Sequence, residues 1–164
     1  MDLNILHLSL IQNEDEYIDS LKKVIKEDMN PIAKEVKEAG AEFIFLSIPR
    51  KDVMMPEDLP STYIRGKKDY LKYVDIIKEV KSEDVELIDA YEVFKRRNKS
   101  EIDVFYQTDH HLNIYGGYYL FEELVEKTNE DGKKIELGSL KDEYIVEKRV
   151  VNGSYNRKIG QLIK

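Results

Sequence analysis

The sequence lacks cysteine and tryptophan, and it has no long apolar run. The absence of cysteine from its 164 residues excludes a disulfide framework, a cysteine nucleophile and metal sites built on thiolates. No stretch approaches the roughly 18 consecutive apolar residues of a membrane-spanning helix, and no signal-peptide pattern follows Met1. We therefore expect no membrane span in this chain.

The chain is also short of positive charge. It holds 26 Lys and Arg against 33 Asp and Glu, a formal net charge of −7. Proteins that bind nucleic acid phosphates or anionic lipids gather basic residues on one face. The charged stretch at 95–99 is the densest basic run, and we expect it to be a solvated helix end. Nucleic acid is therefore not expected as a partner.

Repeats, low-complexity tracts and linkers rich in proline or glycine are absent as well. An apolar content of 41% is enough to fill the core of one domain of this length. We expect residues 1–164 to form a single domain, with residues 132–164 as a more loosely packed C-terminal segment.

What the chain does contain is an alternation of strand-like and helical patterns. Strands or extended segments are predicted at residues 4–11, 42–48, 85–89 and 103–106. Helices are predicted at residues 14–29, 32–39, 70–80, 90–98 and 114–125. Pro31 should break or kink the first helical stretch, Gly40 should end the second, and residues 50–65 should form a long loop. The alternation predicts an α/β fold with a mainly parallel sheet, which binds ligands at the carboxyl ends of its strands.

Polar side chains that can do chemistry are concentrated in Phe105-Tyr-Gln-Thr-Asp-His-His-Leu-Asn113. A carboxylate two residues before an imidazole can accept its Nδ1 proton, fix its tautomer and leave Nε2 as a general base. Asp109 would then orient His111. Metal ligation is the rival interpretation, because Asp109, His110 and His111 are competent ligands for zinc, manganese or iron. A third interpretation treats them as ordinary polar loop residues.

Several segments together resemble a known family. Tyr106-Gln-Thr-Asp-His-His-Leu-Asn-Ile-Tyr-Gly-Gly-Tyr-Tyr119 resembles the signature of the DHHW proteins of Gram-positive bacteria. These belong with the alginate O-acetyltransferase group of SGNH-hydrolase-like proteins. Ser47-Ile-Pro-Arg-Lys51 is similar to the family's Pro-x-Lys segment, and the segments at 85–94 and 153–157 resemble further parts of it.

The resemblance implies a three-layer α/β/α sandwich that transfers or removes an O-acetyl group on a cell-envelope polysaccharide or other acetylated glycan. Asp109 and His111 match the Asp-His part of a Ser-His-Asp triad, which needs no metal and no cofactor. The expected substrate-binding residues are Lys51, His110 and Tyr115. Of these, Lys51 matches a recurrent lysine of the family. The resemblance also implies an extracytoplasmic location and a membrane-bound acyl-transfer partner.

The chain departs from the family pattern in two places. Leu112 stands where the family has tryptophan. The second departure concerns the nucleophile, which in the family follows the His motif on a later strand. The serines after the motif here, Ser139 and Ser154, follow neither a buried strand nor an acidic residue. Ser9 and Ser47 lie near predicted strand ends, but before the motif.

From the second departure we expect the chain to be a fragment, incomplete at its C-terminus, that lacks the nucleophile strand. Two alternatives to an acetyltransferase or esterase stay open. One is a non-catalytic envelope module that binds glycan or a partner. The other is a metal-dependent phosphoesterase named for its Asp-His-His motif, although this chain shows no Asp-x-Asp ligands before that motif.

Overall fold

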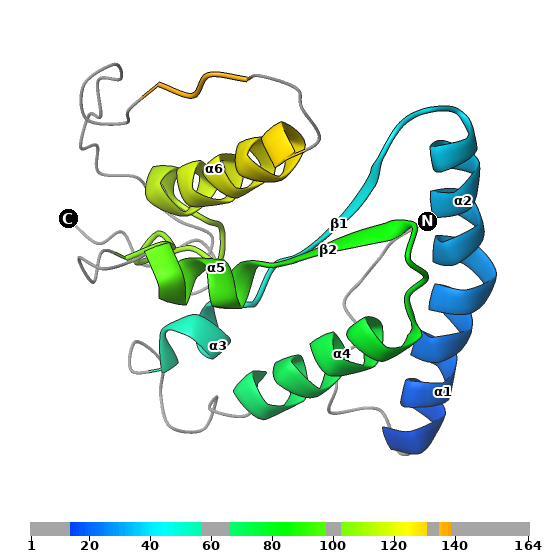
Figure 1. The fold of residues 1–164 in the computed structure, drawn as a ribbon. Coiled ribbons are helices and arrows are strands. Elements are labelled where there is room, and N and C mark those ends of the chain that lie inside the picture. Colours follow the sequence, from blue (N-terminus) through cyan, green and yellow to red (C-terminus); the bar gives the residue numbers. More distant parts are fainter. Residues whose placement is uncertain (1–13, 57–65, 98–102, 131–134, 139–164) are drawn as a thin grey trace. The chain divides into compact units, whose positions relative to one another are not determined.

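The computed structural model describes residues 14–56, 66–97, 103–130 and 135–138 (Figure 1). The elements are α1 (Glu14–Val24), η2 (Ile25–Met29), α2 (Asn30–Glu38), β1 (Phe43–Ser47), α3 (Lys51–Met54), α4 (Gly66–Val80), β2 (Val85–Asp89), α5 (Ala90–Arg97) and α6 (Ile114–Glu130). The predicted alternation of helix and strand is confirmed over these residues. The predicted strand at 4–11 lies outside them, as does the segment 132–164 apart from 135–138. No described helix is both long enough and apolar enough to cross a membrane.

The interruption expected at Pro31 takes the form of a widened turn and not a break. The backbone stays in the right-handed helical region at Val24, Met29 and Asn30. Asn30 donates its backbone N–H to the carbonyl of Ile25, five residues earlier, which is the π-helical pattern. Proline crowds the carbonyl four residues before it and lacks an N–H of its own. A π turn directly before Pro31 therefore lets the helix continue.

Gly40 ends α2 as predicted. Its φ of +79° lies in the left-handed region that glycine adopts at little cost. The backbone N–H of Gly40 donates to Lys37, at 2.9 Å, and that of Ala41 donates to Val36, at 3.0 Å. This pair of bonds is the Schellman arrangement, which satisfies carbonyls at the end of a helix.

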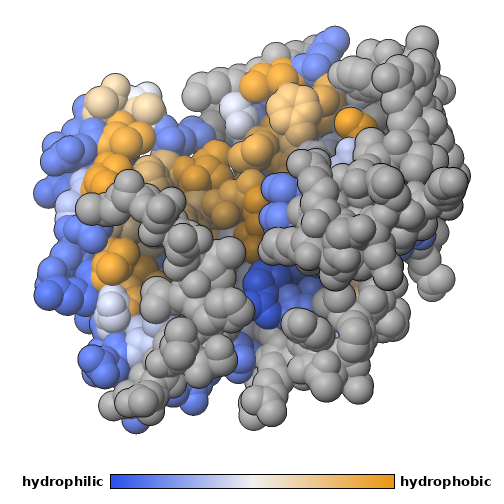
Figure 2. Space-filling view, turned by 180° about the vertical axis from the view of Figure 1, so that it is seen from behind, coloured by the Kyte–Doolittle hydropathy of each residue, from blue (hydrophilic) through white to orange (hydrophobic). Residues whose placement is uncertain are grey.

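The chain divides into two compact units, 1–46 with 68–87 and 47–67 with 88–164. Unit 1 holds a hydrophobic cluster whose buried members are Ile25, Met29, Ala33, Ile77 and Val85. Each large apolar side chain buried in this way contributes about 1.5–3 kcal/mol. Figure 2 shows hydrophilic residues along the outer side of the α1–α2 segment, at the left of that view. This segment is therefore amphipathic, as its periodicity predicts.

β1 and β2 pair as a two-stranded parallel sheet. Their bounds agree with two of the predicted strands, and the α/β class is confirmed. The predicted segment at 103–106 is not a further strand of this sheet, because Phe105 alone forms an isolated antiparallel bridge, with Leu112. The reason is local, because the chain reverses direction between Phe105 and Leu112, and the segment before this turn pairs with the segment after it.

Unit 2 contains α3, α5 and α6. Its buried apolar side chains include Val53, Val93, Phe94, Val104, Phe105, Leu120 and Val125. The loop predicted at 50–65 begins instead as the short helix α3, and residues 57–65 lie outside the described part.

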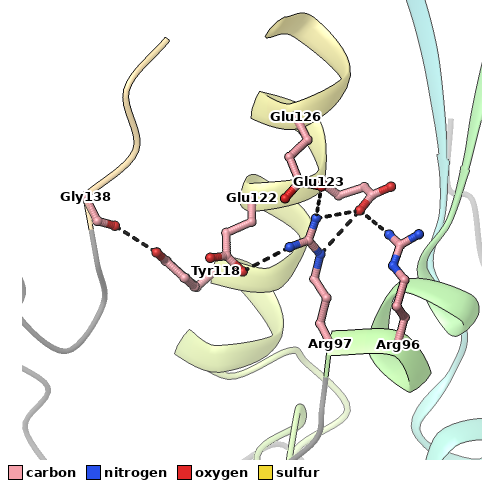
Figure 3. A network of polar contacts seen from close by, with 7 residues as sticks. All are labelled: Arg96, Arg97, Tyr118, Glu122, Glu123, Glu126 and Gly138. Atoms are coloured by element: carbon pink, nitrogen blue, oxygen red, sulfur yellow. Dashed lines mark hydrogen bonds and ion pairs between the residues drawn. The ribbon is translucent and has the colours of Figure 1, made fainter. Parts of the chain in front are cut away.

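An ion-pair network joins α5 to α6 (Figure 3). Arg97 Nη2 lies 2.8 Å from Glu123 Oε2 and also pairs with Glu126, while its Nη1 lies 3.5 Å from Glu122. Arg96 donates to the same Glu123 oxygen. The prediction of a solvated helix end is therefore wrong for Arg97, whose side chain is only 16% exposed. It failed because the acidic partners come from α6, remote in the sequence.

The network sets the protonation states of Glu123, which is buried, and of Arg97, which is partly buried. Burial alone would raise the pKa of the Glu123 carboxyl, but hydrogen bonds from Arg97 and Arg96 outweigh it and lower that pKa below its ordinary value. Burial would likewise lower the pKa of Arg97, and its bonds to Glu123 and Glu126 raise it instead. Both groups are therefore charged at neutral pH.

Candidate active site

The Asp-His-His motif lies at the tip of a tight turn in unit 2. The Tyr106 N–H donates to the His111 carbonyl at 3.1 Å, and the Asn113 N–H donates to the Val104 carbonyl at 3.0 Å. Inside this pairing, the Asp109 N–H donates to the Tyr106 carbonyl at 3.3 Å. These backbone bonds close the chain on itself and present the motif as one turn.

Asn113 joins this turn to α6. Its Oδ1 accepts the backbone N–H groups of Tyr115, at 2.9 Å, and Gly116, at 3.1 Å, as an N-cap does. Its Nδ2 donates to the carbonyls of Phe105, at 3.1 Å, and Asp103. One side chain therefore fixes both the start of the helix and the strand-like segment before the turn.

Gly116 allows the first turn of α6 to lie against that segment. A Cβ placed on Gly116 would stand 2.4 Å from the Val104 carbonyl oxygen and 3.1 Å from Leu112 Cδ2. The same test on Gly117 meets nothing within 4 Å. Only the first of these adjacent glycines is required by close packing.

Gly116→Ala should therefore lower the free energy of unfolding by about 1–3 kcal/mol, because either the helix or the Val104 backbone must move. Gly117→Ala is the matched control. It should be neutral or stabilise the helix by up to about 1 kcal/mol, since alanine has the higher helix propensity. Urea unfolding of the two variants measures the difference. Equal effects would show that the close approach does not limit residue size at Gly116.

Within the turn, Asp109 holds His111 by two contacts. Asp109 Oδ1 lies 2.5 Å from His111 Nδ1 and accepts the His111 backbone N–H at 3.1 Å. The carboxylate side chain is 16% exposed, whereas the imidazole side chain is 68% exposed. The geometry fits a carboxylate that orients an imidazole by its Nδ1–H, so that Nε2 can accept a proton at the surface.

His110 belongs to the same cluster. Its Nδ1 lies 3.4 Å from Asp109 Oδ1, and its ring centroid lies 4.0 Å from that of His111. Asp109, His110 and His111 offer ligand atoms that all lie within 4.8 Å of one another, a donor set that suits zinc, manganese or iron. However, both imidazoles turn Nδ1 toward one carboxylate oxygen, so a cation would compete with the Asp109–His111 contact.

The other two predicted site residues, Lys51 and Tyr115, lie outside the Asp-His-His cluster. Lys51 is buried and donates from Nζ to the carbonyls of Tyr106, at 3.0 Å, and Gln107, at 2.7 Å. It therefore contacts the backbone of the turn that carries Asp109. Tyr115, half-buried, lies in the first turn of α6. The substrate-binding roles of both stay predictions.

A family model described as an SGNH hydrolase-like domain, acetyltransferase AlgX, matches residues 16–159, which is most of the chain. The chain belongs to this SGNH hydrolase-like acetyltransferase family. No curated protein matches it.

Two solved structures of Bacillus cereus PatB1 resemble this SGNH hydrolase-like chain. One shares 24% sequence identity, with a TM-score of 0.55, over 73% of this chain and 39% of PatB1. The other, PatB1 with a sulfonyl adduct, shares 26% identity with a TM-score of 0.52 over 75% of this chain and 39% of that one. The chain thus spans well under half the length of the PatB1 structures.

Sequence reasoning missed one residue of this candidate site, Asn113, and the buried environment of another, Lys51. Asn113 stands directly before a helical pattern, and asparagine is a preferred N-cap, so this signal was present in the sequence. The burial of Lys51 carried no such signal, since its partners are backbone carbonyls more than fifty residues later.

Proposed function

We propose that this protein is an O-acetyltransferase or acetylesterase that acts on a cell-envelope polysaccharide, with Asp109 and His111 as two members of a Ser-His-Asp triad. The observation that carries the proposal is the 2.5 Å contact from Asp109 Oδ1 to His111 Nδ1, in a chain of an acetyltransferase family. Membership in the DHHW group, an extracytoplasmic location and a membrane-bound acyl-transfer partner are finer parts of the same proposal.

In this reaction His111 Nε2 takes the proton of a serine hydroxyl while the serine oxygen attacks the acetyl carbonyl carbon. The ester C–O bond then breaks, and the imidazolium returns the proton to the departing oxygen. An acetyl-serine results. Attack by a sugar hydroxyl on this intermediate gives transfer, and attack by water gives hydrolysis. Asp109 stabilises the imidazolium in each half-reaction.

The third member of the triad is a serine that the sequence alone does not single out. Ser47 ends β1, and Ser9, Ser139 and Ser154 lie outside the described residues. The sulfonyl adduct of PatB1 suggests the means to find it, because sulfonyl groups form stable covalent bonds with activated nucleophiles.

Incubation of the full-length protein with an arylsulfonyl fluoride should stop release of acetate from an acetylated chromogenic ester and label one serine, which peptide mass spectrometry would identify. The physical reason is that only a serine whose proton passes to His111 is nucleophilic enough to react. A heat-unfolded sample is the control and should stay unlabelled. No turnover of acetyl esters, with binding of acetylated glycan retained, would favour the non-catalytic module.

The Asp109, His110 and His111 cluster also favours a second candidate, a metal-dependent phosphoesterase. Metal analysis of the purified protein discriminates between the two. Stoichiometric manganese or zinc that is lost in Asp109→Asn, together with phosphodiester cleavage, would replace the acetyl-transfer proposal.

A further inference from the structure

Lys51 is a buried cation held by the turn that carries the site. It begins α3, and only 3% of it is exposed. A buried ammonium is costly unless hydrogen bonds replace its water. Its Nζ donates to the carbonyl oxygens of Tyr106 and Gln107 at 3.0 and 2.7 Å. Consecutive carbonyls of one turn are thereby held by a single charge from another part of the chain.

One of those carbonyls also closes the turn. The Tyr106 oxygen accepts the backbone N–H of Asp109 at 3.3 Å as well as the Lys51 ammonium. Asp109 in turn accepts both the backbone N–H and the Nδ1 contact of His111. A continuous series of polar contacts thus leads from the ammonium through the backbone of the turn to the imidazole.

We propose that Lys51 is a positioning residue, which holds turn 106–109 in the conformation that lets Asp109 orient His111. Its catalytic consequence rests on the function proposed above. The ammonium acts through the turn and does not touch the reacting acetyl group. A side chain with 3% of its surface exposed offers a substrate little to bind, so this role differs from the substrate contact predicted from the sequence.

The test is Lys51→Met, which keeps an unbranched apolar stem and removes the charge and its donors. We expect kcat for an acetylated ester to fall about 10- to 100-fold, because a small displacement of the base is costly. KM should stay within about twofold, since Lys51 makes no contact with the substrate and its loss leaves ground-state binding unchanged. By ¹⁵N NMR, the His111 ring should change from a single Nδ1–H tautomer to a mixture.

Lys95→Met is the matched control. Lys95 is a half-exposed lysine of α5 that pairs with Glu92, and its loss should leave kcat, KM and the His111 tautomer as in the wild type. A rise in KM with kcat and the tautomer preserved in Lys51→Met would overturn the proposal in favour of substrate binding. Three unchanged readouts would overturn it outright.

If Lys51→Met does not fold, labelling of wild-type lysines by reductive methylation decides the question. Lys51 should react far more slowly than Lys95, at a rate that acetylated substrate does not change. If Lys51 reacted as fast as Lys95, and acetylated substrate slowed that reaction, the positioning role would be contradicted. The NMR and labelling results need no turnover, so absence of ester cleavage would refute the proposed function while these results still decide the role of Lys51.

Discussion

His111→Ala should lower kcat for acetyl-ester cleavage by at least about a thousandfold, with little change in KM. The imidazole accepts the proton of the nucleophile and returns it to the leaving oxygen, so its loss removes an interaction made in the transition state. Its ring is exposed, so the substitution should leave stability nearly unchanged. Steady-state kinetics with an acetylated chromogenic ester, on the same full-length protein, measures the effect.

Two neighbouring variants make this result specific. Asp109→Asn keeps the shape of the side chain but can stabilise the wrong tautomer of His111, and we expect a loss of about 100- to 10,000-fold in kcat. His110→Ala removes an adjacent imidazole of similar exposure and should cost less than about tenfold, expressed in KM if His110 binds substrate. Wild-type turnover in His111→Ala, or equal losses at His110 and His111, would contradict the assigned base.

The part of this site that a local pattern encodes could be predicted from the sequence. Asp109 and His111 are two residues apart, and a single turn brings their side chains into contact. In the same way β2 has the predicted bounds, because a short segment with β-branched and other apolar residues, ended by Asp89, specifies a strand. Local sequence patterns therefore predict both the strand β2 and the Asp109–His111 contact of the site.

What depends on long-range contacts could not be predicted. The family resemblance predicts a substrate-binding role for Lys51, and nothing near Lys51 in the sequence shows that carbonyls of the turn at 106–107 accept hydrogen bonds from its ammonium. Arg97 was assigned to solvent because its partners lie on α6. In both cases the burial of a charge depends on packing between segments, and a charged residue taken alone is mostly exposed.

Arg97→Met should lower the free energy of unfolding at neutral pH by about 2–3 kcal/mol. Removal of one member of a buried ion pair leaves the other charge without full compensation, which usually costs about 3–5 kcal/mol. The Arg97–Glu123 pair is only partly buried, and Arg96 still donates to Glu123 in the variant, so the cost should fall below that range. Arg96→Met is the matched control. Because Arg96 is 61% exposed, its removal should cost less than about 1 kcal/mol. Urea unfolding, with hydrogen exchange of the α6 amides, measures both (Figure 3).

The same pair predicts how stability depends on pH. The pKa of Glu123 is lowered in the folded protein, since bonds from Arg97 and Arg96 outweigh burial. A carboxyl with a lowered folded pKa contributes stability above its unfolded value, near the ordinary 4.5, and that contribution is lost as the pH falls through the folded pKa. Wild-type protein should therefore lose α6 protection in acid more steeply than Arg97→Met, which lacks the part of the contribution that comes from Arg97. Parallel acid profiles for the two proteins would show that the Arg97–Glu123 pair does not couple protonation to folding.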